Sequence, residues 1–138
     1  MFLHSVMRTS LVLVLMSGSL AMAQPKTRKV ANGTWGGEQI KVAVEGNSAT
    51  IEYSCAHGTI NGPLVLDKKG NFKLLGTHTR ERGGPTRSDE NANAKPAVYT
   101  GTISGKTMTL TVKLSDSDEV IGTFKVVLGE EARLFRCM

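Results

Sequence analysis

The chain has 138 residues and a formal net charge of +5 at pH 7. It contains one Trp, two Tyr and four Phe, too few aromatic rings for the stacking platform with which proteins bind single-stranded nucleic acid. Most of its basic residues are scattered along the sequence, which is typical of a solvated surface. We therefore expect no nucleic acid among its partners.

The first 23 residues have the pattern of a cleavable signal peptide. Arg8 precedes the apolar run 11–16, and Ala21-Met22-Ala23 places small residues at a cleavage site. Cleavage there would leave Gln24 as the first residue of the mature protein. The apolar run is shorter than the roughly 20 residues that a membrane-spanning helix needs. We therefore expect a periplasmic or extracellular protein with no membrane span after cleavage.

The mature chain is predicted to form one domain. Residues 24–31 are polar, contain Pro25 and are expected to be a flexible N-terminal lead-in. Residues 32–138 are long enough for one compact core and are expected to fold as a single β-barrel domain. No helical periodicity is found in them.

Apolar and polar residues alternate along most of this domain, as in Ile40, Val42 and Val44 with Lys41 between them. Alternation with period two is typical of strands with one buried face. Turn-forming residues separate the runs, as in Ser104-Gly105-Lys106. A bulge is expected at Gly36-Gly37 and a bend at Gly62-Pro63. The expected strands are 34–45, 48–56, 58–66, 71–80, 97–103, 107–114, 119–128 and 132–137.

Eight strands joined mostly by short turns predict an all-β fold, an antiparallel up-and-down meander. A meander of this length closes into a small barrel because closure removes its exposed edges. A two-layer β-sandwich is the alternative.

The two cysteines, Cys55 and Cys137, are predicted to form one disulfide, as expected for a pair in an exported protein. In the up-and-down count, Cys55 ends the second strand and Cys137 ends the eighth. Both then lie at the same end of the barrel, as a disulfide requires.

Gly33-Thr34-Trp35 on the first strand and Arg136 on the last resemble the sparse signature of the calycins, the lipocalin and avidin group. This resemblance implies a closed barrel in which Trp35 packs under the basic side chain of Arg136. In size and architecture the chain also resembles small disulfide-bonded barrels of the bacterial envelope, such as periplasmic inhibitors of lysozyme and of metalloproteases.

Candidate binding residues gather at the barrel end that carries the disulfide. His57 continues the inward phase of the second strand, and His78 that of the fourth. The long loop 81–96 adjoins them. The residues expected at this site are Trp35, His57, His78, Arg80, Arg82 and Tyr99. The alternative is that the histidines form local hydrogen bonds and cap the core, beside a merely solvated loop.

No metal site, cofactor or catalytic group is expected. Two histidines fall short of the three or four ligands of zinc sites, and a disulfide-bonded Cys55 beside His57 cannot act as a nucleophile. The leading hypothesis is a secreted or periplasmic, non-catalytic binding domain for a small ligand or a protein partner. One alternative is an inhibitor of a secreted or envelope enzyme of protease or lysozyme type. The other is an enzyme with an unrecognised site.

Overall fold

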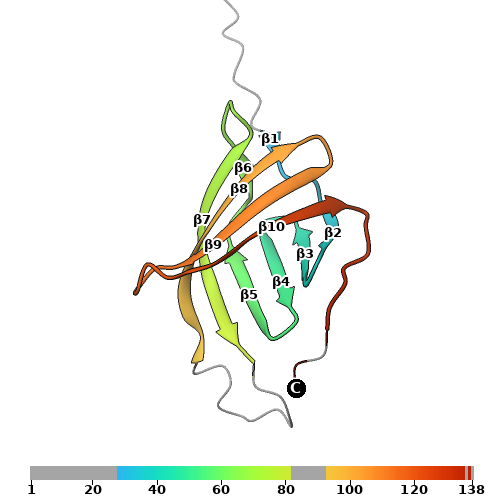
Figure 1. The fold of residues 1–138 in the computed structure, drawn as a ribbon. Helices are drawn as coiled ribbons and strands as arrows, with labels where there is room; N and C mark the ends of the chain where they lie inside the picture. Colours follow the sequence, from blue (N-terminus) through green and yellow to red (C-terminus); the bar gives the residue numbers. More distant parts are fainter. Residues whose placement is uncertain (1–27, 82–92, 136, 138) are drawn as a thin grey trace, which may run out of the picture.

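The computed structural model describes residues 28–81, 93–135 and 137. Their main feature is a closed antiparallel barrel in which each strand pairs with the next and β10 pairs with β2 (Figure 1). The prediction of an all-β, eight-stranded meander closed into a barrel is confirmed, and the sandwich alternative is wrong. The barrel strands are β2 (Gly33–Gly37), β3 (Ile40–Glu45), β4 (Ser48–Tyr53), β5 (Ala56–Asn61), β7 (Asn71–Arg80), β8 (Lys95–Ser104), β9 (Thr107–Leu114) and β10 (Val120–Leu128).

The predicted first strand, 34–45, is two strands joined by a turn at Glu38 and Gln39, where Gln39 has a φ of 62°. The bulge expected at Gly36-Gly37 is also wrong, because both glycines pair in regular register with β3. The prediction of an eighth strand at 132–137 is wrong, since the described residues of this segment make one ladder contact, a parallel bridge from Arg133 to Glu38. These two errors cancel, so the strand count stays at eight.

The predicted strand 58–66 ends early, because the chain leaves the barrel at the expected bend. Gly62 has a φ of 141°, and beyond it β6 (Val65–Leu66) pairs with β1 (Arg28–Lys29) outside the barrel. Part of the expected lead-in therefore belongs to the fold. The amide of Val30 donates to the carbonyl of Leu64 at 2.9 Å, and both side chains are buried.

Every barrel strand contributes to one apolar core, as strand alternation requires. Burying a large apolar side chain contributes about 1.5–3 kcal/mol to folding. The described residues include no helix long and apolar enough to cross a membrane. One buried core residue from each strand, in chain order, is Trp35, Val42, Ile51, Ile60, Phe72, Tyr99, Leu110 and Val126.

After β10 the chain turns back along the outside of the barrel, and we call residues 129–135 the strap (Figure 1). The amide of Arg133 donates to the carbonyl of Gly37 at 3.0 Å, and the amide of Phe135 donates to Oγ of Ser54, also at 3.0 Å. Beyond the strap, Cys137 forms the predicted disulfide with Cys55. The strap therefore reaches the turn between β4 and β5. The signal-peptide prediction lies outside the described residues.

Candidate functional site

One end of the barrel, which we call the disulfide end, brings together the turn 54–55, the end of β7, the start of β8 and the turn 115–119. The strand register places them there, because Ala56 pairs with Arg80, His78 with Lys95, and Val120 with Lys113 of β9. The prediction that Cys55, His78 and Arg80 share one end of the barrel is therefore confirmed.

His78 points into the barrel, as its phase along β7 predicts. It is 6% exposed, and its ring packs edge-on against Tyr53, with 5.2 Å between the ring centroids. Nδ1 of this histidine has no hydrogen-bond partner within the described part of the chain. A buried polar group without a partner destabilises a fold by roughly 1–3 kcal/mol, so this nitrogen is an unusual feature of the disulfide end.

His57 lies on the outer face, so the prediction that it points inward is wrong. Its neighbours Ala56 and Gly58 are buried, as is Ile60 in the same phase of β5, while Nδ1 of His57 lies 2.7 Å from a carboxylate oxygen of Glu81. The turn 54–55 changes which residues point inward: odd-numbered residues do so in β4, and even-numbered residues do so in β5. The phase that places Tyr53 inside therefore cannot be extended along the sequence to His57.

Tyr99 lies deep in the core and is held by β7. Its hydroxyl donates to the carbonyl of Thr77 at 2.6 Å, and burial raises its pKa to about 12. Tyr53, on the facing strand β4, was not singled out as a site residue by the sequence, although it continues the inward phase of Ile51. Burial and the nearby Tyr99 raise the pKa of Tyr53, and its hydroxyl finds no partner among the residues described.

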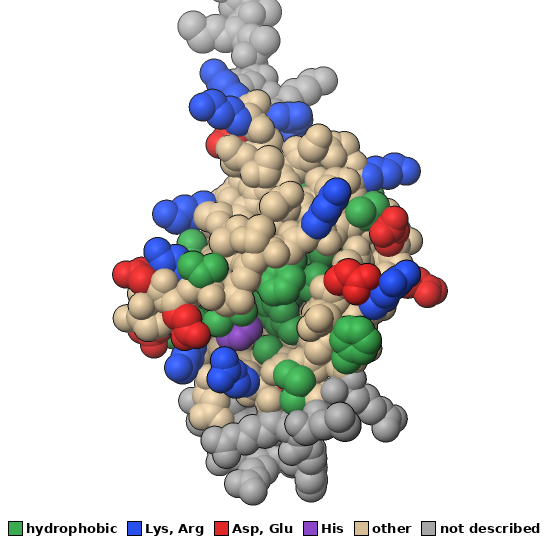
Figure 2. Space-filling view, viewed as in Figure 1, with side chains coloured by type: hydrophobic (Ala, Val, Ile, Leu, Met, Phe, Trp, Pro, Cys, Tyr) green, Lys and Arg blue, Asp and Glu red, His purple; other side chains and the backbone are tan. Residues whose placement is uncertain are grey.

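A pocket of about 280 Å³ opens beside His78. Arg80 and Lys95 supply positive charge, while Leu114 and Ile121 supply an apolar wall. Figure 2 shows hydrophobic side chains and a histidine at the centre of one face, with charged side chains around them. The residues that line this pocket are His78, Arg80, Asn93, Lys95, Leu114, Glu119 and Ile121.

The surroundings of His78 favour its neutral form. Burial is the largest influence that lowers the pKa of His78 below its ordinary value, and Arg80, His57 and Lys95 lower it further, whereas Glu119 raises it. At neutral pH the pocket therefore offers an uncharged imidazole between two permanent cations.

The other predicted site residues do not join this pocket. Trp35 is 1% exposed, and its indole N–H donates to the carbonyl of Ala31, upstream of β2, at 3.1 Å. β2 starts opposite the disulfide end, because Gly33 pairs with Val44. The prediction that places Trp35 at the disulfide end is therefore wrong, and Trp35 is a core residue, as its predicted structural role implies. Arg82, Arg136 and most of the loop 81–96 lie outside the described residues.

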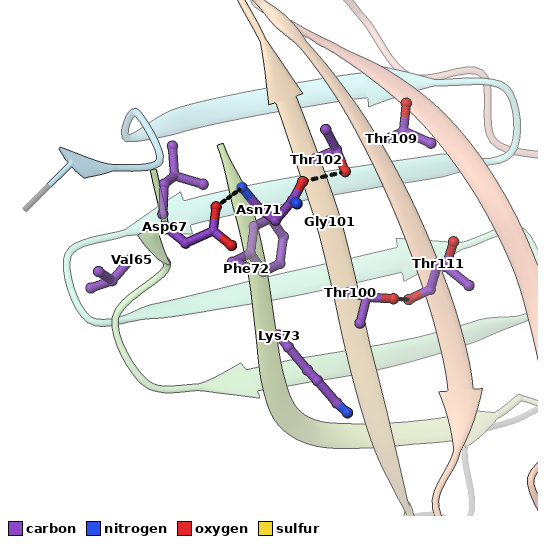
Figure 3. Close-up of a pocket in the computed structure, with 11 residues that line it drawn as sticks. Val65, Asp67, Asn71, Phe72, Lys73, Thr100, Gly101, Thr102, Thr109 and Thr111 are labelled. Carbon is purple, nitrogen blue, oxygen red and sulfur yellow. Dashed lines mark hydrogen bonds between the residues drawn. The ribbon is translucent and has the colours of Figure 1, made fainter. Parts of the chain in front are cut away.

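A wider depression of about 600 Å³ lies over β7, β8 and β9 (Figure 3). Its polar groups largely bond to one another. The hydroxyl of Thr102 donates to the side-chain oxygen of Asn71 at 2.8 Å, and the amide of Asn71 donates to Asp67 at 2.9 Å. The pocket beside His78 differs because a buried nitrogen there is unpaired, and for that reason we take it as the candidate site.

Comparison of the chain with protein-family models, curated proteins and solved structures finds no match. The closed eight-stranded barrel is the architecture that the resemblance to calycins implies, but other antiparallel barrels share it. A fold does not determine a function. The function therefore has to be inferred from the geometry of the pocket beside His78.

Proposed function

We propose that this chain is an exported, non-catalytic binding domain that holds a small ligand in the pocket at the disulfide end. The observation that carries the proposal is the unpaired Nδ1 of the buried His78 on the wall of that pocket. Ligand pockets combine apolar walls with a few convergent polar groups. Leu114 and Ile121 supply the walls here, and His78, Arg80 and Lys95 supply the polar groups.

The size of the pocket limits the ligand. Ligand pockets commonly measure about 300–1,000 Å³, and this one, at about 280 Å³, is slightly smaller than that range. A single ring or a short chain with one polar group matches this volume. The ligand is therefore a small molecule and not an extended polymer.

Export is supported by two independent features. Residues 1–23 have the composition of a signal peptide, and the disulfide between Cys55 and Cys137 is typical of proteins in oxidising compartments. The protein then acts in the periplasm or outside the cell. A relation to the calycins belongs to the same proposal and rests on Gly33-Thr34-Trp35 at the start of the barrel.

Blocking the pocket tests this function. Ile121 lines the pocket and Val120, its neighbour, is 59% exposed and does not. We expect Ile121→Trp to fill the space and to abolish binding of benzamide and benzoate, followed by NMR of backbone amides. The matched Val120→Trp variant should bind as wild type does. Amide shifts scattered over the whole barrel, or binding that survives Ile121→Trp, would contradict the proposal.

A further inference from the structure

The charged and titratable groups around the His78 ring come from every element packed against it. Two of them, Arg80 and Lys95, carry permanent positive charge, and Glu119 is the only carboxylate of the described residues that lines the pocket. A neutral imidazole between these groups leaves the pocket with a positive balance. The full set is Tyr53 of β4, His57 of β5, Arg80 of β7, Lys95 of β8 and Glu119 of the turn 115–119.

This charge balance favours an anionic ligand. The apolar walls of the pocket favour a ligand that also has an apolar part. Leu114 is buried and Ile121 is half-buried on the side of the pocket formed by β9 and β10. A hydrated inorganic anion would leave this apolar surface uncovered. An organic anion would cover it with its carbon skeleton and would place its charge toward Arg80 and Lys95.

Resting on the proposed function, we propose that the ligand is a small organic carboxylate and that its capture transfers a proton from solvent to His78. Only bonds to the transferred proton change: the bond that held it in the buffer acid breaks, and an N–H bond of the imidazole forms. The buffer loses one proton and the imidazole becomes an imidazolium. The positive charge of this imidazolium, on the wall of the pocket, then attracts the carboxylate together with Arg80 and Lys95.

A bound anion changes the electrostatic surroundings that keep His78 neutral. In the free protein, burial and the nearby cations oppose a charge on the ring. A carboxylate within about 4–6 Å favours the charged form of a histidine and raises its pKa. Between the lower pKa of the free protein and the higher pKa of the complex, binding takes up a proton. The pocket therefore captures carboxylates more tightly as the pH falls and releases them as it rises.

Benzoate and benzamide provide a matched pair of probes, because they have nearly the same shape and differ in charge. We would titrate each into the secreted protein by calorimetry between about pH 5 and about pH 8, where histidine titrates. As the pH rises, benzoate affinity should fall by up to about tenfold per pH unit, which is the slope expected when binding takes up one proton. Benzamide affinity should not change. Calorimetry in two buffers of different ionisation enthalpy should show proton uptake for benzoate alone.

Two variants identify the group that takes up the proton. His78→Gln keeps a polar side chain but cannot become cationic, so benzoate should bind without pH dependence. His57→Gln changes the histidine outside the pocket and should keep the wild-type slope. NMR titration of the His78 ring in the wild-type protein should show its pKa rise when benzoate is added, and this readout does not depend on either variant folding.

Three other outcomes are possible, and each contradicts a different claim of this inference. If benzoate and benzamide both bind the pocket with equal affinity and no pH dependence, the ligand is not selected as a carboxylate and its binding takes up no proton. The proposed binding function would still stand. If the slope persists in His78→Gln, another group takes up the proton and the role of His78 is wrong. If neither probe shifts the amides of the pocket, this inference and the proposed function both fail.

Discussion

At the scale of single residues, the site depends on an imidazole that is buried but not paired. His78 is 6% exposed and rests edge-on against Tyr53, whose own hydroxyl is also unpaired among the described residues. Buried polar groups in folded proteins are rarely left unpaired. These two groups lie at the same barrel end, next to the pocket for which we propose a ligand.

The pKa of His78 predicts how stability depends on pH. The pKa is lower in the folded protein than its ordinary value of about 6.5, so the unfolded chain takes up a proton first as the pH falls. The free energy of unfolding should therefore decrease as the pH drops through the ordinary pKa of histidine toward the folded value.

Urea unfolding at a series of pH values measures this decrease, and the difference between wild type and His78→Gln isolates it from the titration of carboxylates. The decrease should be smaller in His78→Gln. His57→Gln, which alters the outward-facing histidine, should keep the decrease seen in wild type. If wild type and His78→Gln show parallel pH profiles, the buried imidazole does not contribute to the pH dependence.

Alternation along a strand was enough to predict that His78 points inward, because β7 runs without interruption from Asn71 to Arg80. The same method placed His57 wrongly, because the turn 54–55 shifts the phase between two strands. It did not identify Tyr53 as part of the site. Which buried hydroxyls and nitrogens stay unpaired depends on contacts between β4, β7 and β8, and no local pattern contains that information.

At the scale of elements, β10 pairs unequally on its two sides. It pairs with β9 from Val120 to Val127, with a register shift near Ile121, but its pairing with β2 covers only Val126–Leu128. Beyond that short ladder, the rings of Phe124 and Tyr53 pack 5.5 Å apart and join β10 to β4. The barrel wall between β10 and β4 is therefore completed by side chains and less by backbone hydrogen bonds.

The strap accounts for a glycine on the outer face of β2. A Cβ atom on Gly36 would lie 2.2 Å from the carbonyl oxygen of Glu130 and 2.7 Å from the amide nitrogen of Ala132. These are backbone atoms, so Gly36→Ala should displace the strap and lower the free energy of unfolding by about 1–3 kcal/mol, the usual range for overpacking. Hydrogen exchange at the amides of Gln39 and Arg133, which pair across this contact, should become faster.

The double variant Cys55→Ser with Cys137→Ser is the control for this prediction, because it releases the end of the strap from the barrel. In that background the strap can move away from an alanine at position 36. The effect of Gly36→Ala on stability should then be smaller. An equal effect with and without the disulfide would mean that the methyl group disturbs β2 itself.

The elements that the sequence predicted well are those with both alternation and turn residues at their ends. β9 is the clearest, since 107–114 matches its observed bounds. The turn at Glu38 and Gln39 was missed because neither residue is a typical turn former, and Gln39 adopts its positive φ without being glycine. The segment 132–137 was predicted as a strand because it is short and partly apolar, but its partners are a turn and a serine hydroxyl instead of a ladder.

At the scale of the whole molecule, the disulfide joins two parts of the chain 82 residues apart. The barrel closes through the ladder between β10 and β2, and the disulfide adds a second closure over most of the same chain. The up-and-down count placed Cys55 and Cys137 correctly at the same end, although the eighth strand it assumed is the strap and the segment after it. The predicted position of Cys137 stayed correct despite this error, because the strap returns to the same barrel end that an eighth strand would have reached.

The disulfide should stabilise the barrel chiefly by restricting the unfolded chain. In the chain-entropy model, a loop of this length contributes about 4–5 kcal/mol to the free energy of unfolding. We expect the double variant Cys55→Ser with Cys137→Ser to retain its β-rich circular dichroism spectrum, because the ladders of the barrel do not involve either cysteine, but to unfold at a lower urea concentration. Reduction of the wild-type protein should lower the unfolding midpoint to the same value, which separates loss of the bond from effects of the serines. Thiol titration of the denatured, non-reduced protein should find no free thiol. Two free thiols, or a midpoint that reduction leaves unchanged, would show that the protein does not depend on this bond.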